Sequence, residues 1–275
     1  MDSKYNKTIS AEESKFLELL NAEGKTWFNM EEAYSLMESK TDGAVRFMLK
    51  RMVDKGLLTK FGKSLFWIVP FDADAVTYMP DWHLLAGALA GECSHYIGYY
   101  SALQIHSLIT QPSLKEQVVS DTHKAQTLVF KSVEFQFIKQ NEKHFFGAKK
   151  IWIDSYNKVL CSDLEKTIID CLYMPDYAGG IVEVAKALWT AREKLDYAKL
   201  LQYAKRFGSQ VVIKRLGYLL DNLGIDNPIV DELLKERSAA VSPLDTEVPP
   251  EGRISTKWSI LQNVDLETIK NAIEN

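Results

Sequence analysis

The sequence is poor in the residues that usually build metal and disulfide sites. It has 3 cysteines and 5 histidines in 275 residues. No Cys-x-x-Cys pair occurs, so we expect reduced thiols and not a disulfide framework. His95 and His106 are spaced to share a helix face, but no third ligand lies near them, as a zinc site would require. We therefore predict neither a metal nor a cofactor from these residues, which are Cys93, Cys161, Cys171, His83, His95, His106, His123 and His144.

Long hydrophobic runs are also missing. No stretch approaches the about eighteen apolar residues that cross a bilayer. The first ten residues, MDSKYNKTIS, are polar and lack the apolar core of a signal peptide. These absences predict a cytoplasmic protein. The net charge of −4 argues against a protein that coats nucleic acid indiscriminately, although it leaves room for a local basic surface.

Familiar catalytic signatures are absent as well. The sequence has no Gly-x-Ser-x-Gly motif and no phosphate-binding glycine loop ending in Lys-Ser/Thr. The nearest approach to an enzyme is IDSYNKVLCSDLEK, residues Ile153–Lys166, which loosely resembles metal-dependent nucleases. Such nucleases place an acid and a lysine two apart on one strand, whereas Glu165 and Lys166 are adjacent and predicted to be helical. We predict a protein that is not an enzyme, with a nuclease as the less favoured alternative.

What the sequence does contain begins with three helices and a hairpin. Ser10 with Glu13 has the spacing of a capping box, and Asn29 is a good N-cap for a second helix. Two β-prone runs, Leu57–Phe61 and Leu65–Val69, flank the segment Gly62–Lys63–Ser64, whose composition is typical of a turn. The predicted elements are helices Ser10–Asn21, Met30–Glu38 and Thr41–Lys55, then strands Leu57–Phe61 and Leu65–Val69. This order predicts a winged helix-turn-helix over residues 1–70.

The third predicted helix and the hairpin are basic. Between residues 40 and 63, Lys and Arg clearly outnumber Asp, while the preceding residues are acidic on balance. In a helix-turn-helix the second helix of the pair enters the major groove, where an arginine can bond a guanine edge and lysines hold phosphates. The predicted contacts to double-stranded DNA are Thr41, Arg46, Lys50, Arg51, Lys60 and Lys63. The alternative is a winged helix that contacts only protein.

Residues 71–275 form the second predicted domain. Helices are expected at Trp82–Ala90 and Tyr96–Ile109, and the chain is predicted helical from Asp163 almost to Leu234. Strands are expected between them, at Gln117–Ser120, Val133–Ile138, Ile151–Asp154 and Lys158–Cys161. The predicted fold class is α+β: an N-terminal winged helix-turn-helix, then a larger mixed domain with a small sheet and a mainly helical C-terminal half.

One segment of this domain is unusually basic. From Tyr197 to Leu220 there is no acidic residue. Two adjacent helices there would present a basic surface that engages an acidic partner or a nucleic acid. The alternative is ordinary helix-surface charge paired with acids elsewhere. The residues of the predicted basic surface are Lys199, Lys205, Arg206, Lys214 and Arg215.

Several stretches occur together in an order that resembles one family. They are YIGYYSALQIHSL (Tyr96–Leu108), SDLEKTIIDCLYMPDYAGGIVEVAKAL (Ser162–Leu188) and VIKRLGYLLDNLGI (Val212–Ile225), followed by Leu244–Asp245, Gly252, Trp258 and Asn263. This combination resembles the AbiEi-type antitoxins of type IV toxin–antitoxin and phage-defence systems, over nearly the whole chain. The resemblance implies a repressor that binds operator repeats upstream of its own operon. It also implies an antitoxin that counteracts a nucleotidyltransferase-like toxin without a stable complex.

A different reading of the second domain is a stand-alone, ligand-responsive transcription regulator. Its aromatic residues would then hold a small molecule, although such side chains more commonly pack in a core. The residues concerned are Tyr96, Tyr99, Tyr100, Tyr173 and Tyr177.

Overall fold

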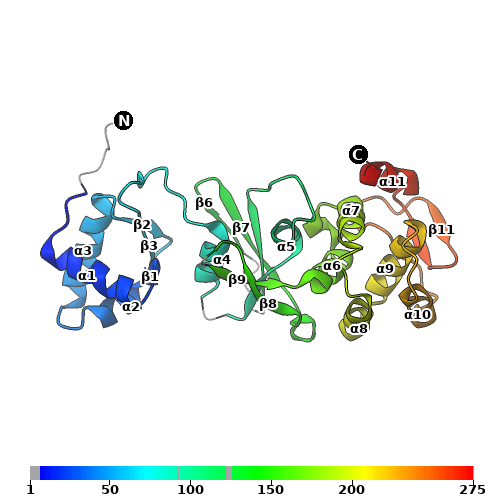
Figure 1. The fold of residues 1–275 in the computed structure, drawn as a ribbon, viewed down its shortest axis with the longest axis horizontal. Coiled ribbons are helices and arrows are strands. Elements are labelled where there is room, and N and C mark those ends of the chain that lie inside the picture. The colour runs from blue at the N-terminus through cyan, green and yellow to red at the C-terminus, as the bar shows by residue number, and fades with distance from the viewer. Residues whose placement is uncertain (1–6, 92, 122–125, 156, 275) are drawn as a thin grey trace. The chain divides into compact units, whose positions relative to one another are not determined.

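The computed structural model describes residues 7–91, 93–121, 126–155 and 157–274. The chain forms two compact units, Met1–Gly91 and Glu92–Asn275. The described residues have a mixed α+β architecture, so the predicted α+β class is confirmed (Figure 1). The division after Gly91 lies later than the predicted boundary at residue 70, since the helix Trp82–Ala90 falls within the first unit. No described helix is long and apolar enough to cross a bilayer.

The first unit consists of helices and a small antiparallel sheet. Its elements are α1 (Ala11–Ala22), β1 (Trp27–Asn29), α2 (Met30–Leu36), α3 (Asp42–Asp54), β2 (Leu58–Phe61), β3 (Leu65–Ile68) and α4 (Trp82–Ala90). The sheet has the order β1-β3-β2. Both predicted N-caps are present, because Ser10 with Glu13 and Asn29 with Glu32 form complete capping boxes. The sequence did not predict β1, which is too short to show an alternating pattern.

The core of the first unit fixes which face of α3 is buried. Phe28 of β1 packs between Phe16 of α1, at 5.1 Å between ring centroids, and Phe66 of β3, at 5.4 Å. Val45 and Leu49 of α3 belong to the same apolar cluster. Figure 1 shows α1, α2 and α3 gathered on one side of the sheet. The opposite face of α3 is therefore left to solvent.

The second unit begins with a sheet and ends in helices (Figure 1). Within the described residues its main sheet has six strands in the order β6-β7-β5-β4-β9-β8. The strands are β4 (His95–Ile97), β5 (Lys115–Ser120), β6 (Gln126–Phe130), β7 (Val133–Lys139), β8 (Ala148–Trp152) and β9 (Lys158–Ser162). The β5–β7 and β4–β9 pairs are parallel, and the other pairs are antiparallel.

The helices of this unit pack into one large apolar core. They are α5 (Tyr99–Ile105), η1 (Glu142–His144), α6 (Leu164–Tyr173), η2 (Pro175–Ala178), α7 (Ile181–Ala191), α8 (Tyr197–Phe207), α9 (Gln210–Asn222), α10 (Ile229–Glu236) and α11 (Leu266–Glu274). A second small sheet joins β10 (Ser242–Pro243), β12 (Ile260–Gln262) and β11 (Arg253–Ser255).

The predicted helix over Tyr96–Ile109 is wrong at its start. Tyr96 and Ile97 belong to β4, where they pair with Val119 and Val118 of β5. The helix α5 begins only after Gly98, whose position has no room for a side chain, since a Cβ there would lie 2.7 Å from Val119 Cγ2. Sheet pairing with a distant segment thus overrides the local helical pattern.

The closing sequence pattern ties the C-terminal segment to the helices. A carboxylate oxygen of Asp245 accepts a hydrogen bond from the Ile181 backbone at 2.7 Å and so caps the start of α7. The Asn263 side-chain oxygen accepts a hydrogen bond from the Asp245 backbone N–H, and its amide nitrogen donates one to the Asp245 backbone oxygen. The indole of Trp258 covers Gly217, where a Cβ would lie 2.0 Å from the ring. These residues have packing and capping roles that explain their pattern.

Candidate nucleic-acid interface

Helix α3 presents one polar face to solvent. Thr41 caps it, since its hydroxyl accepts a hydrogen bond from the Ala44 backbone at 3.3 Å. Its buried side chains are Val45, Met48, Leu49 and Met52. The exposed residues of the helix are Asp42, Gly43, Ala44, Arg46, Phe47, Lys50, Arg51 and Asp54. The cap fixes where the helix starts, and the core fixes which side chains face outward.

A groove of about 450 Å³ lies between α3 and the β2–β3 hairpin. Arg46 and Lys50 line it from α3, while Lys60 and Lys63 line it from the hairpin. Its remaining lining is largely apolar and includes Met30, Leu49, Val53 and Phe66. The structure therefore brings together four of the six residues predicted to contact DNA. We call these four the groove cations: Arg46, Lys50, Lys60 and Lys63.

Arg46 is held in place by α2. Its Nε donates a hydrogen bond to the Tyr34 hydroxyl, and its guanidinium carbon lies 5.7 Å from the centre of the Tyr34 ring. The hydrogen bond to Tyr34 raises the pKa of Arg46 above its ordinary value. The contact restricts the side chain without neutralising its charge. The guanidinium therefore faces the groove in a restricted conformation, so it would lose less conformational entropy on binding a ligand.

Arg51 differs from the groove cations because an acid binds it. Its guanidinium lies 3.2 Å from a carboxylate oxygen of Glu13, and the Lys55 ammonium lies 2.7 Å from the other oxygen. Burial alone would raise the pKa of Glu13, but hydrogen bonds from Lys55 and Ser10 outweigh burial and lower it. Glu13 is thus ionised at neutral pH and partly neutralises Arg51. Thr41, the sixth predicted residue, lies at the leading end of α3 as a cap.

Phe47 and Tyr34 were not among the residues predicted to contact DNA. The Phe47 side chain is 63% exposed in the middle of the solvent face of α3. A signal was present in the sequence, because Phe47 is out of register with Val45, Met48, Leu49 and Met52. Tyr34 gave no comparable signal, since its contact with Arg46 depends on how α2 packs against α3.

The basic surface predicted in the second unit is wrong for two of its five members. Lys214 is 1% exposed and Arg215 is fully buried. The Lys214 ammonium donates to the backbone oxygen of Ala240, and Arg215 donates to backbone oxygens of Leu172 and Pro243. Their acceptors are carbonyls of other segments and not acids, so the sequence gave no sign of the pairing. Through these hydrogen bonds, both side chains hold the neighbouring segments against α9.

The other three members lie on α8 in different surroundings. The Lys199 ammonium lies between Asp163 and Glu165, at 2.9 and 2.7 Å. Lys205 pairs with Glu236 at 2.9 Å, and the Arg206 guanidinium stacks 4.1 Å from the centre of the Phe146 ring. The stretch without acids is therefore neutralised in part by acids from outside it.

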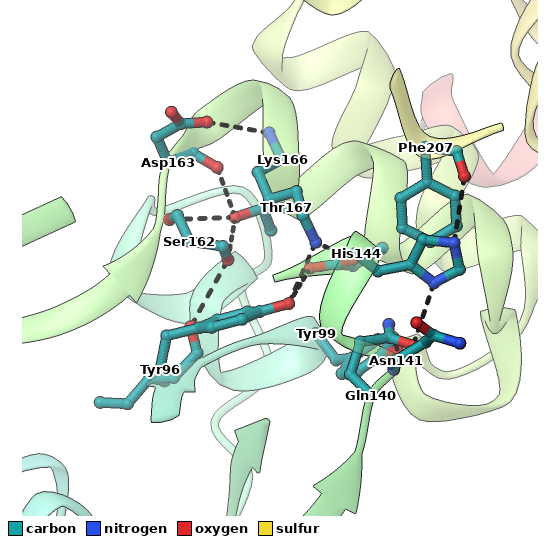
Figure 2. Close-up of polar contacts among 12 residues, drawn as sticks. Tyr96, Tyr99, Gln140, Asn141, His144, Ser162, Asp163, Lys166, Thr167 and Phe207 are labelled. Carbon is teal, nitrogen blue, oxygen red and sulfur yellow. Dashed lines mark hydrogen bonds and ion pairs between the residues drawn. The ribbon is translucent and has the colours of Figure 1, made fainter. Parts of the chain in front are cut away.

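Lys166, which the nuclease alternative invoked, lies in the core of the second unit. Its ammonium lies 3.0 Å from the Tyr96 hydroxyl (Figure 2). The same ammonium pairs with the Asp170 carboxylate, to which the Tyr96 hydroxyl donates a hydrogen bond. Burial raises the pKa of Asp170, while Lys166 opposes the rise. Glu165 binds Lys199 instead of joining this group. Among the described residues, no three His, Cys, Asp or Glu side chains gather as metal ligands.

The five tyrosines proposed to hold a ligand lie in different places: two in the core, two at a pocket, and Tyr173 partly buried against the core. Tyr96 and Tyr99 are fully buried. Tyr100 and Tyr177 instead line a pocket of about 460 Å³, together with Gln117 and other polar residues. The Gln117 side chain accepts a hydrogen bond from the Tyr100 backbone and donates one to Gln136, so the pocket wall is ordered.

The chain is similar to a solved structure over its whole length. The crystal structure of the Rv2827c protein from Mycobacterium tuberculosis matches it with a TM-score of 0.71, covering 100% of this chain and 98% of that chain. The two sequences are 13% identical, so the similarity shows a common fold alone. No protein-family model matches the chain, and no curated protein matches it.

Proposed function

We propose that the first unit contains a winged helix-turn-helix that binds double-stranded DNA, and that the protein is a sequence-specific transcriptional repressor. The order α1-β1-α2-α3-β2-β3 supports this proposal, with α3 as the helix in the major groove and the β2–β3 hairpin as the wing. The alternative of a purely protein-contact module does not require cations on both the helix and the hairpin.

The observation that carries the proposal is the set of groove cations. Arg46, Lys50, Lys60 and Lys63 come from two elements and line one groove, in a chain whose net charge is −4. A duplex is a dense polyanion, and side chains on the groove helix and the wing meet its bases and its backbone respectively. Arg46, already oriented by Tyr34, is suited to a guanine edge, whereas Lys63 at the hairpin turn is suited to a phosphate.

The test is a selection of bound duplexes from a random pool, followed by fluorescence anisotropy at fixed salt. Arg46→Ala should weaken binding by about 10- to 100-fold and broaden the selected sequence, because a bidentate base contact is lost. Lys63→Ala should lower the affinity for all duplexes alike. Lys270→Ala, which changes an exposed lysine of α11, is the matched control. Unchanged binding in both groove variants would reject the proposal.

We also propose that the second unit acts as the antitoxin against a nucleotidyltransferase-like toxin, as the resemblance to AbiEi-type antitoxins implies. Lys205 and Arg206 are the exposed basic residues of this stretch, and changing them disturbs only surface contacts, namely the Lys205–Glu236 ion pair and the Arg206 stack on Phe146. Replacing both with Glu should reduce rescue of cell growth when the toxin encoded beside this gene is co-expressed. Full rescue by that variant, at equal protein level, would exclude these two residues from neutralisation.

A second candidate function is ligand-responsive regulation. The pocket beside Tyr100 and Tyr177 favours it, since ordered amides and two aromatic rings suit a small polar aromatic molecule. A thermal-shift screen against metabolites tests it, because a ligand that binds only the folded state raises the melting temperature. A shift that persists in a Tyr177→Ala variant would place the ligand elsewhere.

A further inference from the structure

Phe47 occupies an unusual place on α3. Every other large apolar residue in the middle of this helix is buried, whereas Phe47 is 63% exposed. A single exposed aromatic needs no explanation by itself. Phe47, however, shares a helix face with Gly43, one turn earlier, and Lys50, one turn later. This face lies opposite the buried residues.

The neighbours of Phe47 define a charged rim around an apolar centre. Arg46 and Lys50 lie toward the groove, and Arg51 lies toward α1, where Glu13 holds it. Among the described residues, apart from the backbone of α3 itself, no atom lies within 4 Å of where a Cβ on Gly43 would be. The phenyl ring is thus an apolar patch with Gly43 one turn before it, Lys50 and Arg51 one turn after it, and the acid Asp54 two turns after it.

This arrangement fits the floor of a major groove. The N-terminal half of a groove helix faces base edges, and thymine alone presents a methyl group there. Arg46 and Lys50 on the groove side complement the phosphates that border the groove, whereas Arg51 on the other side adds less because Glu13 pairs with it. We propose that Phe47 contacts thymine methyl groups and thereby selects thymine at the base pairs next to the one that Arg46 contacts. This inference rests on the proposed function and names the base that the same surface recognises.

The test uses the full chain and the duplex selected by the wild-type protein. Each thymine is replaced in turn by deoxyuridine, which removes the methyl and keeps every hydrogen bond. At the contacted positions the wild-type affinity should fall by about 3- to 10-fold per methyl, because apolar burial is lost. The Phe47→Ala variant should bind the thymine and deoxyuridine duplexes equally, and Phe47→Leu should restore part of the difference.

Two controls separate recognition from folding. Phe71→Ala removes a phenyl ring that is 59% exposed and lies outside α3 and the hairpin, so it should keep the full sensitivity to the methyl. Thermal denaturation of Phe47→Ala should match the wild type, since an exposed ring contributes little to the core.

The outcomes distinguish this inference from the proposed function. Failure of the wild-type protein to bind any duplex overturns the proposed function, and this inference with it. Sequence-specific binding in which Phe47→Ala keeps the wild-type sensitivity to deoxyuridine overturns this inference alone. A change of oligomeric state in Phe47→Ala, with methyl sensitivity unchanged, would likewise overturn it and assign the ring to contact between copies.

Discussion

Arg46 and Arg51 lie on one short helix, yet their neighbours give them different electrostatic roles. Tyr34 orients Arg46 through its hydroxyl without pairing with its charge, and the nearby acid Asp42 acts on that charge only at the helix surface. Glu13 of α1 accepts a hydrogen bond from Arg51 and partly neutralises the Arg51 charge. Arg51 was predicted to contact DNA from its residue type and spacing alone. The sequence could not reveal its partner, because Glu13 is distant along the chain and meets Arg51 only when α1 packs on α3.

At the same scale, the half-buried His106 of the second unit links its stability to pH. His106 donates from Nε2 to the Ser162 backbone oxygen at 2.8 Å, and burial lowers its pKa below the ordinary value of about 6.5. The unfolded chain therefore takes up the proton first as the pH falls. The contribution of His106 to stability is complete above the ordinary pKa and is lost toward the lowered one.

We expect a His106→Gln variant to show a weaker pH dependence of its unfolding free energy than the wild type. The measurement is urea denaturation between about pH 7.5 and about pH 5, where the wild-type stability should decline with falling pH. His106→Gln should be less stable throughout but decline less steeply. An equal decline in both proteins would show that His106 does not take up a proton on unfolding in this range.

At the scale of elements, the sequence predicted best where the signal is local. The capping box at Ser10 and the N-cap residue Asn29 marked two helix starts in the first unit. The sequence predicted poorly where a strand pairs with a segment far away in the chain. The short strand β1 pairs with β3, and β4, which pairs with β5, replaces the first turn of an expected helix. Lys214 and Arg215 show the same limit, because a helical pattern does not reveal which carbonyls a buried cation will meet.

Helix α9 offers a prediction about close packing. Gly217→Ala would place a methyl group 2.0 Å from the Trp258 ring, which is buried and donates from its indole nitrogen to Asp221. The ring must shift, and we expect a loss of about 1–3 kcal/mol in the free energy of unfolding. Gly43→Ala is the control, since it enters open space on α3. A Gly217→Ala variant as stable as the wild type in chemical denaturation would contradict this packing.

At the scale of the whole molecule, the groove cations contrast with a chain that is acidic overall. Such a protein has little general attraction to polyanions, so the proposed DNA binding depends on a small surface. The sequence identified that surface in outline, since basic residues cluster between residues 40 and 63. It could not show that the hairpin turns Lys60 and Lys63 toward Arg46 and Lys50, because that depends on the sheet order β1-β3-β2.

The most direct measurement is the salt dependence of duplex binding by the wild type and by a variant with all four groove cations replaced by Gln. Each phosphate contact contributes a slope of about −0.9 to the plot of log affinity against log salt, so the variant should be flatter by about 2 to 4. In a charge-matched control, Gln replaces four exposed lysines of the second unit. These are Lys149, Lys150, Lys194 and Lys270, and this variant should keep the wild-type slope. Equal slopes for the wild type and the groove variant would contradict DNA binding through this groove.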